Sequence, residues 1–364
     1  MLSLSDPWAH AHGGTLRTRG FLRAFSELGH DVVCIFPSRA VAHAQEAGRS
    51  LAVPVDPIGT RRQFGPVRRI KRFVLPMPTT LGARNQEVSA AVAAESPDVV
   101  VVSALAQAAY FDAAPAARRW LDMSDLWSEF ARREAQSRPA GARQLAMLQQ
   151  RQIAAAEQTR VREAAVVTAA GHSDAAILAG STGASVSWLP TSLDVPIVPM
   201  AVPAPKVAGF IANFGYWPNR DAWHLLASRW LPRLREIGWE VAVAGLGSAE
   251  LAELPGVRRL GPVGEVSDFY REVSVTLAPI RLGGGMKVKV AESLLAGRAV
   301  VGTPFAVDGF SPEVRALTHI VELDDPDFTR LAEVSVQSVE REPLAVFRPD
   351  HLREQVRRLL EAVH

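Results

Sequence analysis

The sequence has 364 residues, of which 48% are hydrophobic and 21% are charged. At about 150 residues per domain this length predicts two domains, and the composition is that of a folded globular protein and excludes a disordered chain. The formal net charge of +2 gives no overall reason to expect nucleic acid as a partner. The N-terminus does not resemble a signal peptide, no apolar stretch could span a bilayer, and the single cysteine, Cys34, is typical of a reducing compartment. We therefore expect a cytoplasmic protein.

The chain opens with a very short strand, a loop that contains Gly13 and Gly14, and a helix that ends at Gly29. Glycines in such a loop would let a ligand approach the backbone at the start of the helix. A simple tight turn explains them equally well. The opening residues therefore give one candidate ligand-binding loop.

Short β-branched runs then alternate with longer helical patterns. The runs lie at 31–36, 98–103 and 165–170 in the first half of the chain, and at 208–212, 240–245, 274–279, 299–304 and 319–323 in the second. This alternation predicts βαβ units and parallel sheets.

A proline-rich passage at 193–209 interrupts the alternation and predicts a linker between two doubly wound domains. The amphipathic C-terminal segment predicts a helix packed on the body of the protein. We expect a first domain over 1–195, joined by the C-terminal helix 350–364, and a second domain over 196–349.

The segment 61–73 is strongly basic, with apolar residues at helical spacing and no acidic residue. It could contact an anionic membrane at the inner face, or guide an anionic acceptor. A merely solvated surface accounts for the same pattern.

Asp122, Ser124 and Asp125 lie in the stretch LDMSDLWSEF, behind an expected strand of the first domain. A carboxylate at the end of a strand could orient a substrate hydroxyl or stabilise positive charge that develops on a substrate. Asp125 could equally cap the helix that follows. The acidic turn at 323–327 is interpreted as solvated, and we expect no metal site.

Gly245 and Gly247 follow the run at 240–245, but Glu250 stands where a dinucleotide-binding fingerprint has its third glycine. A structural turn is therefore the preferred interpretation. A nicotinamide-dependent oxidoreductase is the more distant hypothesis.

The run at 274–279 leads into Gly283, Gly284 and Gly285 and then into a helix. Ligands of open α/β sheets bind beyond the carboxyl ends of the strands. Backbone N–H groups of this loop and of the helix start would form a nest for an anion.

Lys287 and Lys289 fall in the first turn of that helix, where a cation opposes the helix dipole unless an anion is bound there. Glu292 lies on nearly the same face as Lys289. A surface ion pair between Lys289 and Glu292 would leave the three glycines unexplained. A diphosphate bound by Lys289 and the glycine loop, with sugar hydroxyls bound by Glu292, would explain all of these features.

These stretches resemble one family. The sequences NFGYWPNRDAWHLL, VAVAGLG and LGGGMKVKVAESLLAGRAVVGTP resemble the C-terminal half of the family 4 glycosyltransferases of GT-B architecture. The N-terminal GGTLRTRGFLRAFSELGHDVV is similar to the first βα unit of that family. LPTSLD stands where the family usually has a Pro-Asn-Gly-x-Asp turn.

The resemblance implies an α/β fold of two doubly wound, Rossmann-like domains that face each other across a cleft. It implies a retaining, metal-independent sugar transfer that needs no cofactor besides the nucleotide-diphosphate sugar donor. Glu292 would bind the ribose, Lys289 the diphosphate, and Gly13 and Gly14 would approach the phosphates or the sugar from the facing domain. The donor-binding residues that we expect are Gly13, Gly14, Gly215, Asn219, Gly245, Val266, Gly283, Gly284, Gly285, Met286, Lys287, Lys289 and Glu292.

The sequence also departs from the family. The first of two glutamates that are usual in the family falls on Gly284, and Ser124 stands where many members have the histidine of a His-Asp-Leu-Trp sequence. Asp125, Ser124 and Asp122 are accordingly our candidates for the catalytic residues.

We therefore predict a glycosyltransferase that moves a sugar from a nucleotide-diphosphate donor to a hydroxyl of a small-molecule or lipid-linked acceptor. A nucleotide-sugar epimerase of the same fold, or a nucleotide-sugar-binding protein without transferase activity, is the alternative. The base, the sugar, the acceptor and the oligomeric state stay open.

Overall fold

The computed structural model divides into two compact units, Met1–Ser192 with Pro349–His364, and Leu193–Arg348. The sequence predicted these two boundaries between the units after residue 195 and before residue 350. The structure describes residues 1–4, 6–8, 13–37, 49–53, 85–136, 139–201 and 204–362.

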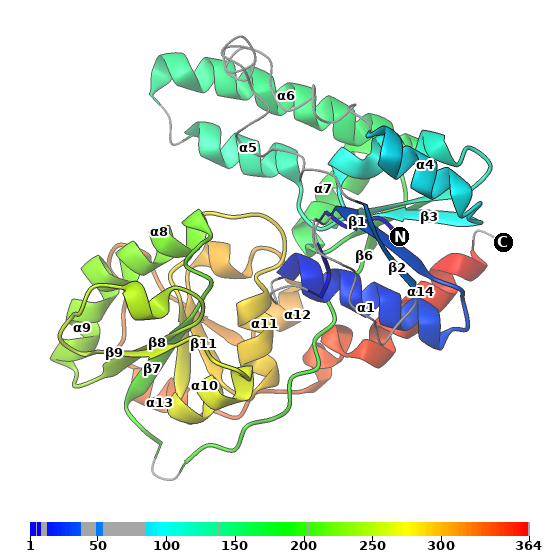
Figure 1. The fold of residues 1–364 in the computed structure, drawn as a ribbon. Coiled ribbons are helices and arrows are strands. Elements are labelled where there is room, and N and C mark those ends of the chain that lie inside the picture. The colour runs from blue at the N-terminus through cyan, green and yellow to red at the C-terminus, as the bar shows by residue number, and fades with distance from the viewer. Residues whose placement is uncertain are drawn as a thin grey trace. The chain divides into compact units, whose positions relative to one another are not determined.

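The first unit is built on parallel strands (Figure 1). β1 pairs with β2, and four further strands pair in the order β3-β4-β5-β6. Leu2 forms parallel bridges to both Ile35 of β1 and Val102 of β3, so the opening residues of the chain join the two groups. The strands are β1 (Val33–Pro37), β2 (Arg49–Val53), β3 (Val99–Val102), β4 (Arg118–Met123), β5 (Val166–Ala169) and β6 (Ser187–Trp188).

Helices cover both faces of this sheet, because successive residues of a strand point to opposite sides. Val101 of β3 packs in one apolar cluster with residues of α1 and α14, whereas Val100 and Val102 pack in another with residues of α4, α6 and α7. Figure 1 shows α1 and α14 side by side. The helical segments are α1 (Gly13–Glu27), α4 (Gln86–Ala94), η2 (Leu105–Ala113), α5 (Trp127–Gln136), α6 (Ala140–Glu163), α7 (His172–Thr182) and α14 (Pro349–Glu361).

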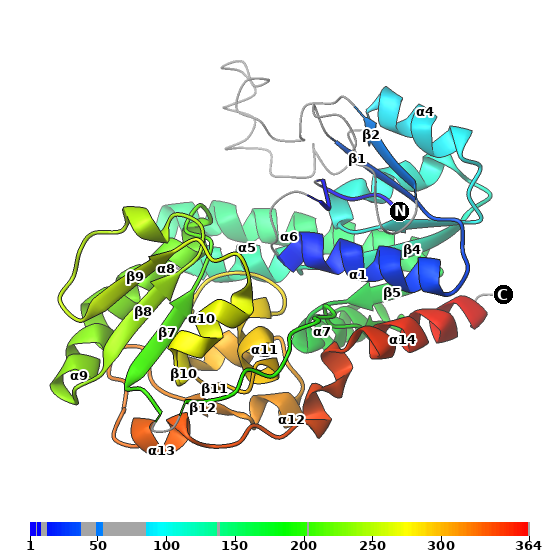
Figure 2. The same cartoon turned by 60° about the horizontal axis from the view of Figure 1, so that its bottom comes forward.

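The second unit holds a six-stranded parallel sheet in the order β12-β11-β10-β7-β8-β9. Figure 2 shows β7, β8 and β9 side by side within it. The strand order reverses between β7 and β10, and such a switch point is where ligands of open α/β sheets bind. The strands are β7 (Val207–Ile211), β8 (Glu240–Ala244), β9 (Val257–Gly261), β10 (Val275–Ala278), β11 (Ala299–Gly302) and β12 (Thr318–Ile320).

Helices follow the strands of this sheet, and α8 continues through one π-helical stretch, η3, into α9. The helical segments are α8 (Trp217–Leu225), η3 (Leu226–Trp230), α9 (Leu231–Glu236), η4 (Ser248–Glu250), α10 (Val266–Glu272), α11 (Val288–Leu295), η5 (Pro304–Val307), α12 (Pro312–Arg315), α13 (Leu331–Ser335) and η6 (Glu342–Phe347). Each unit is thus a Rossmann-like α/β part built on parallel strands, as the sequence predicts.

The start of the proline-rich passage is bound to the second unit. The guanidinium of Arg298, which is 1% exposed, donates to the carbonyl oxygens of Val198 at 2.7 Å and Pro199 at 3.2 Å, and also to that of Tyr270 in α10. The backbone N–H of Leu193 donates to the carbonyl of Phe347 at 2.7 Å. Prolines lack a backbone donor, so a buried arginine with five donors binds this stretch through its carbonyls.

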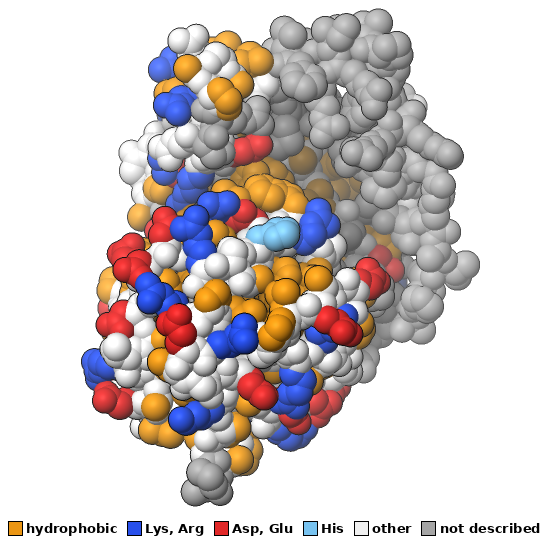
Figure 3. Space-filling view, turned by 90° about the vertical axis from the view of Figure 1, so that its left-hand side faces the viewer, with side chains coloured by type: hydrophobic (Ala, Val, Ile, Leu, Met, Phe, Trp, Pro, Cys, Tyr) orange, Lys and Arg blue, Asp and Glu red, His pale blue; other side chains and the backbone are white. Residues whose placement is uncertain are grey.

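Acidic and basic side chains are interspersed on the side of the molecule that carries α8 and α9 (Figure 3). Ion pairs join α9 and its surroundings to the turn after β12, for example Arg233 to Asp325 at 3.0 Å, with Arg229 paired to Asp324 beside it. Exposed pairs of this kind stabilise a protein only slightly. Within the described parts of the chain, no helix combines the length and the apolar character needed to cross a membrane.

Candidate functional site

The three glycines after β10 form a tight loop. Gly283 has φ +128° and Gly285 has φ +51°, in the region that favours glycine. A Cβ atom on the neighbouring Gly309 would lie 2.9 Å from the Gly285 carbonyl oxygen, so the loop packs directly against the backbone there. Met286, at the end of the loop, is buried. The shape of the loop therefore depends on glycine and on close backbone packing.

Lys287 stands immediately before α11 and is buried, with 8% of its surface exposed. Its ammonium donates to the carbonyls of Gly284 at 3.1 Å and Gly285 at 2.8 Å, and it lies 4.5 Å from the centre of the Phe305 ring. The sequence placed both lysines beside a bound anion. In the structure, Lys287 instead stabilises the glycine loop by donating hydrogen bonds to the carbonyls of that loop.

Lys289 lies in the first turn of α11 and is half-buried. Its ammonium donates to the Asn219 side-chain oxygen at 2.9 Å and lies 4.9 Å from the centre of the Phe210 ring. Burial lowers the pKa of Lys289 to about 8, against the opposing effect of the nearby Glu292 carboxylate. Among the described residues, the Lys289 ammonium, unlike that of Lys287, makes no hydrogen bond to the carbonyls of the glycine loop.

Glu292 lies about one turn further along α11 and is also half-buried. Among the described residues, nothing donates a hydrogen bond to its carboxylate, and no ion pair forms with Lys289 within 4.0 Å. Burial raises the pKa of Glu292 to about 7, and the Lys289 ammonium opposes this rise. A half-buried carboxylate without a protein donor is prepared to accept hydrogen bonds from a ligand.

The other expected donor-binding residues lie where strands of the same sheet end. Gly215 is exposed in the loop between β7 and α8, and its N–H donates to the Asn213 side chain at 2.9 Å. Gly245 follows β8 with φ +109°, and a Cβ atom there would lie 2.1 Å from the Ala212 carbonyl oxygen. The glycine is thus required by the close approach of the loops after β7 and β8. Val266 is the first residue of α10, the helix that follows β9.

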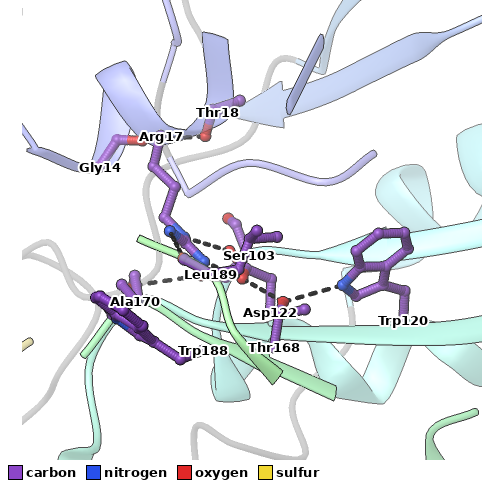
Figure 4. Close-up of polar contacts among 11 residues, drawn as sticks. Gly14, Arg17, Thr18, Ser103, Trp120, Asp122, Thr168, Ala170, Trp188 and Leu189 are labelled. Carbon is purple, nitrogen blue, oxygen red and sulfur yellow. Dashed lines mark hydrogen bonds and ion pairs between the residues drawn. The ribbon is translucent and has the colours of Figure 1, made fainter. Parts of the chain in front are cut away.

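In the first unit, α1 begins at Gly13, and a buried network fixes this helix to the sheet (Figure 4). The Arg17 guanidinium donates to both carboxylate oxygens of Asp122, at 2.7 and 2.5 Å, and to the Leu189 carbonyl at 2.7 Å. Thr168 donates to the same carboxylate at 2.6 Å. Asp122 is completely buried, so this candidate for a catalytic carboxylate has its oxygens engaged inside the unit.

The hydroxyl of Thr18, the residue after Arg17, donates to the Gly14 carbonyl one turn earlier in α1 at 3.1 Å (Figure 4). Arg17 was not singled out from the sequence, because its partner Asp122 is 105 positions away. The network holds the glycine end of α1 in place.

Ser124 and Asp125 follow β4 directly and are half-buried. The Ser124 hydroxyl donates to the Ser103 carbonyl at a long 3.4 Å. α5 begins at Trp127, and the N–H of Ser128 in its first turn donates to the Glu157 carboxylate at 3.1 Å. Glu157 therefore satisfies one backbone donor at the start of α5.

His172 is a residue that the sequence reasoning missed. It begins α7, three positions after the end of β5, and its half-buried ring meets Trp188 edge to face at 5.2 Å. The Trp188 indole N–H donates to the Ala170 carbonyl at 3.1 Å, which fixes both rings. No described residue hydrogen-bonds to the imidazole nitrogens. Its place directly behind a strand could have drawn attention to it.

The basic segment 61–73 lies outside the described residues. Across the described ranges, no three His, Cys, Asp or Glu side chains gather closely enough to hold a metal ion. Cys34 is buried in β1.

Residues 205–332 match the family model described as "Glycosyl transferases group 1". This match lies within the second unit and includes the glycine loop, Lys289 and Glu292. A comparison with curated proteins gave no match.

Solved structures share the fold over nearly the whole chain. HepE (Alr3699) of Anabaena, solved in complex with UDP and glucose, has a TM-score of 0.59 at 12% identity and covers 99% of this chain and 98% of its own. A glycosyltransferase of Rickettsia africae has a TM-score of 0.59 at 10% identity, and the match covers 98% of this chain and 96% of that one. The calicheamicin glycosyltransferase CalG4 has a TM-score of 0.54 at 15% identity, and the match covers 97% of this chain and 96% of that one. The chain thus has the GT-B fold, and its second unit carries the sequence pattern of the group 1 glycosyl transferases.

Proposed function

We propose that the protein is a glycosyltransferase that transfers a sugar, with retention of configuration, from a nucleotide-diphosphate donor to an acceptor hydroxyl. The observation that carries this proposal is the pair on α11. A lysine ammonium and a carboxylate that accepts a hydrogen bond from no described residue lie about one turn apart, both half-buried, behind a loop of three glycines. The match of residues 205–332 to group 1 glycosyl transferases supports it.

The two side chains suit the two chemically different parts of the donor. A diphosphate needs a cation close to backbone N–H groups at a helix start, which Lys289 and the glycine loop supply. A ribose diol needs a fixed acceptor of hydrogen bonds, which Glu292 supplies. Gly215, Gly245 and Val266 would border the donor at the ends of the neighbouring strands.

The same groups would assist the chemistry. When the bond from the sugar to the diphosphate breaks, negative charge grows on the leaving diphosphate and positive charge on the sugar. A fixed ammonium stabilises the leaving group without reorganisation. Lys289 would in this way replace the charge that a metal ion gives other transferases.

On the acceptor side we assign the carboxyl ends of β4 and β5 in the first unit. Asp125 would orient the acceptor hydroxyl, with Ser124 beside it and the imidazole of His172 on the neighbouring strand end. Asp122 is excluded from this role by its buried contacts with Arg17 and Thr168.

One alternative has its own supporting observation. Gly284 and Ser124 stand where the resemblance leads us to expect a glutamate and a histidine. A protein that binds the nucleotide sugar without transferring it would have no need of either side chain.

Incubation with a panel of nucleotide sugars and a mixture of hydroxyl-bearing acceptors separates the two proposals. A transferase releases free nucleoside diphosphate from at least one donor, and the release should fall in the Lys289→Ala variant. Tight binding of a nucleotide sugar without release would instead favour the binding protein. If the protein neither binds nor cleaves any of the donors, both proposals are contradicted.

The pKa values on α11 predict a narrow pH window for donor binding. Glu292, with a pKa of about 7, must be deprotonated to accept from the ribose, so affinity should fall below that pH. Lys289, with a pKa of about 8, must be protonated to bind the diphosphate, so affinity should also fall above that pH. Calorimetric titrations with a nucleotide sugar from about pH 5.5 to about pH 9.5, a range that extends about one and a half units beyond the two pKa values, should give a maximum between them.

The matching nucleoside is the control for this window. It lacks the diphosphate, so its affinity should fall on the acid side only. A donor affinity that is constant across the range would show that neither group binds the donor in a charged form.

A further inference from the structure

Asn219 connects the loop after β7 to α11. It lies in the first turn of α8, where its backbone N–H donates to the Tyr216 carbonyl at 3.1 Å. Its side-chain nitrogen donates to the Asn213 carbonyl at 2.8 Å, and its side-chain oxygen accepts from the Lys289 ammonium at 2.9 Å. One amide thus joins the β7 loop, α8 and α11.

The amide group is suited to this position because it carries a donor nitrogen and an acceptor oxygen on the same carbon. A carboxylate could accept from Lys289 but could not donate to the Asn213 carbonyl. Among the described residues, the Asn219 oxygen is the one atom that accepts a hydrogen bond from the Lys289 ammonium. The centre of the Phe210 ring of β7 lies 4.9 Å from that ammonium, and the ring accepts no classical hydrogen bond.

We infer that Asn219 is a positioning residue that acts through Lys289: its amide oxygen holds the ammonium where the donor diphosphate binds. This inference rests on the proposed function, and it gives Asn219 a role distinct from direct contact with the donor. A lysine side chain has four flexible bonds, and a fixed acceptor removes much of that freedom before the ligand arrives.

The same hydrogen bond also affects the charge of Lys289. A hydrogen bond to the charged form of a group favours that form. Burial lowers the pKa of Lys289, and the groups that face it are Glu292 on α11, Asn219 on α8 and the Phe210 ring on β7. Loss of the Asn219 oxygen should therefore lower this pKa further and weaken diphosphate binding first on the alkaline side.

The test uses calorimetry on the full-length protein, with the best-bound of UDP, GDP, ADP and dTDP and with the matching nucleoside. Asn219→Ala should weaken the diphosphate about tenfold and the nucleoside less than about twofold, which is the scale of one hydrogen bond to a charged group. The alkaline limb of the pH profile should move to lower pH. Asn219→Asp should also weaken the diphosphate, because its carboxylate competes for the ammonium, but it should move the alkaline limb to higher pH.

Asn213→Ala is the matched control, because it removes an amide from the same loop. The Asn213 side chain accepts from the Gly215 N–H at 2.9 Å, and no hydrogen bond joins it to Lys289 within the described residues. It should change neither the ratio of diphosphate to nucleoside affinity nor the alkaline limb. If Asn213→Ala and Asn219→Ala weaken both ligands alike with an unchanged pH profile, Asn219 only shapes the loop and the inference is wrong.

The Lys289 and Asn219 variants distinguish a wrong donor site from a wrong role of Asn219. If Lys289→Ala weakens the diphosphate while Asn219→Ala leaves its affinity and pH profile unchanged, the positioning role is wrong and the donor site stands. If Lys289→Ala has no effect on the diphosphate, the donor site itself is wrong, and the role of Asn219 fails with it.

Discussion

Replacing Asp122 with asparagine is expected to destabilise the first unit by about 3–5 kcal/mol. The change leaves the Arg17 guanidinium, which is 3% exposed, without the charge that it pairs with at 2.7 and 2.5 Å. It also removes the carboxylate that accepts from Thr168. Urea unfolding followed by circular dichroism measures the loss, with nucleoside diphosphate affinity as the check that the second unit remains folded.

The double variant Arg17→Met with Asp122→Asn is the control for this prediction. It removes the buried positive charge together with its partner, so it should be less destabilised than Asp122→Asn alone. If Asp122→Asn unfolds like the wild type but loses turnover, the carboxylate acts in the reaction, and its assignment to the buried network is wrong.

Asp125→Asn is expected to lower turnover by about 10²-fold while donor affinity stays nearly constant, because acid–base and electrostatic groups act mainly in the transition state. The residue follows the carboxyl end of β4 and precedes α5 by two positions. Steady-state kinetics with the active donor and acceptor give the effect on kcat separately from that on KM.

Stability distinguishes this role from helix capping. Asparagine caps helices about as well as aspartate does, so Asp125→Asn should keep the wild-type free energy of unfolding. Asp125→Ala would lose about 1 kcal/mol if the side chain were a cap. Normal turnover in both variants would remove Asp125 from the reaction.

Much of the fold follows from local sequence patterns. All eight β-branched runs form strands, since buried parallel strands need apolar residues on both faces. Three strands were not predicted: β2, β6 and β9. β4 begins with Arg118 and Arg119 and has no β-branched run, so it was expected only from the stretch around Asp122. β6 has two residues, and β9 is an edge strand, so neither shows a continuous apolar run.

The glycine loop could be predicted because its signal lies within a few residues of sequence. Three glycines after a strand, followed by lysines at a helix start, have few structural explanations. The separate roles of Lys287 and Lys289 could not be predicted. They depend on two residues that lie elsewhere in the chain. Phe305 lies against the Lys287 ammonium, and Asn219 in α8 accepts a hydrogen bond from the Lys289 ammonium.

The first unit was harder to interpret for the same reason. The motif around Asp122 looks catalytic as a sequence, since carboxylates cluster behind a strand. Its function in the fold depends on Arg17, 105 positions away, and on Thr168 of the adjacent strand. A buried ion pair between distant segments leaves no periodic trace in the sequence.

Lys289 and Glu292 are proposed to bind different parts of the donor, and calorimetry with a nucleoside and its diphosphate tests this division most directly. Lys289→Ala should weaken the best-bound diphosphate by about tenfold or more while changing nucleoside affinity little, and the loss should shrink as salt screens the charge. Glu292→Gln should weaken both ligands by similar factors, because both keep the ribose. If Lys289→Ala weakens nucleoside and diphosphate equally, or neither, the ammonium does not bind phosphate and the account is contradicted.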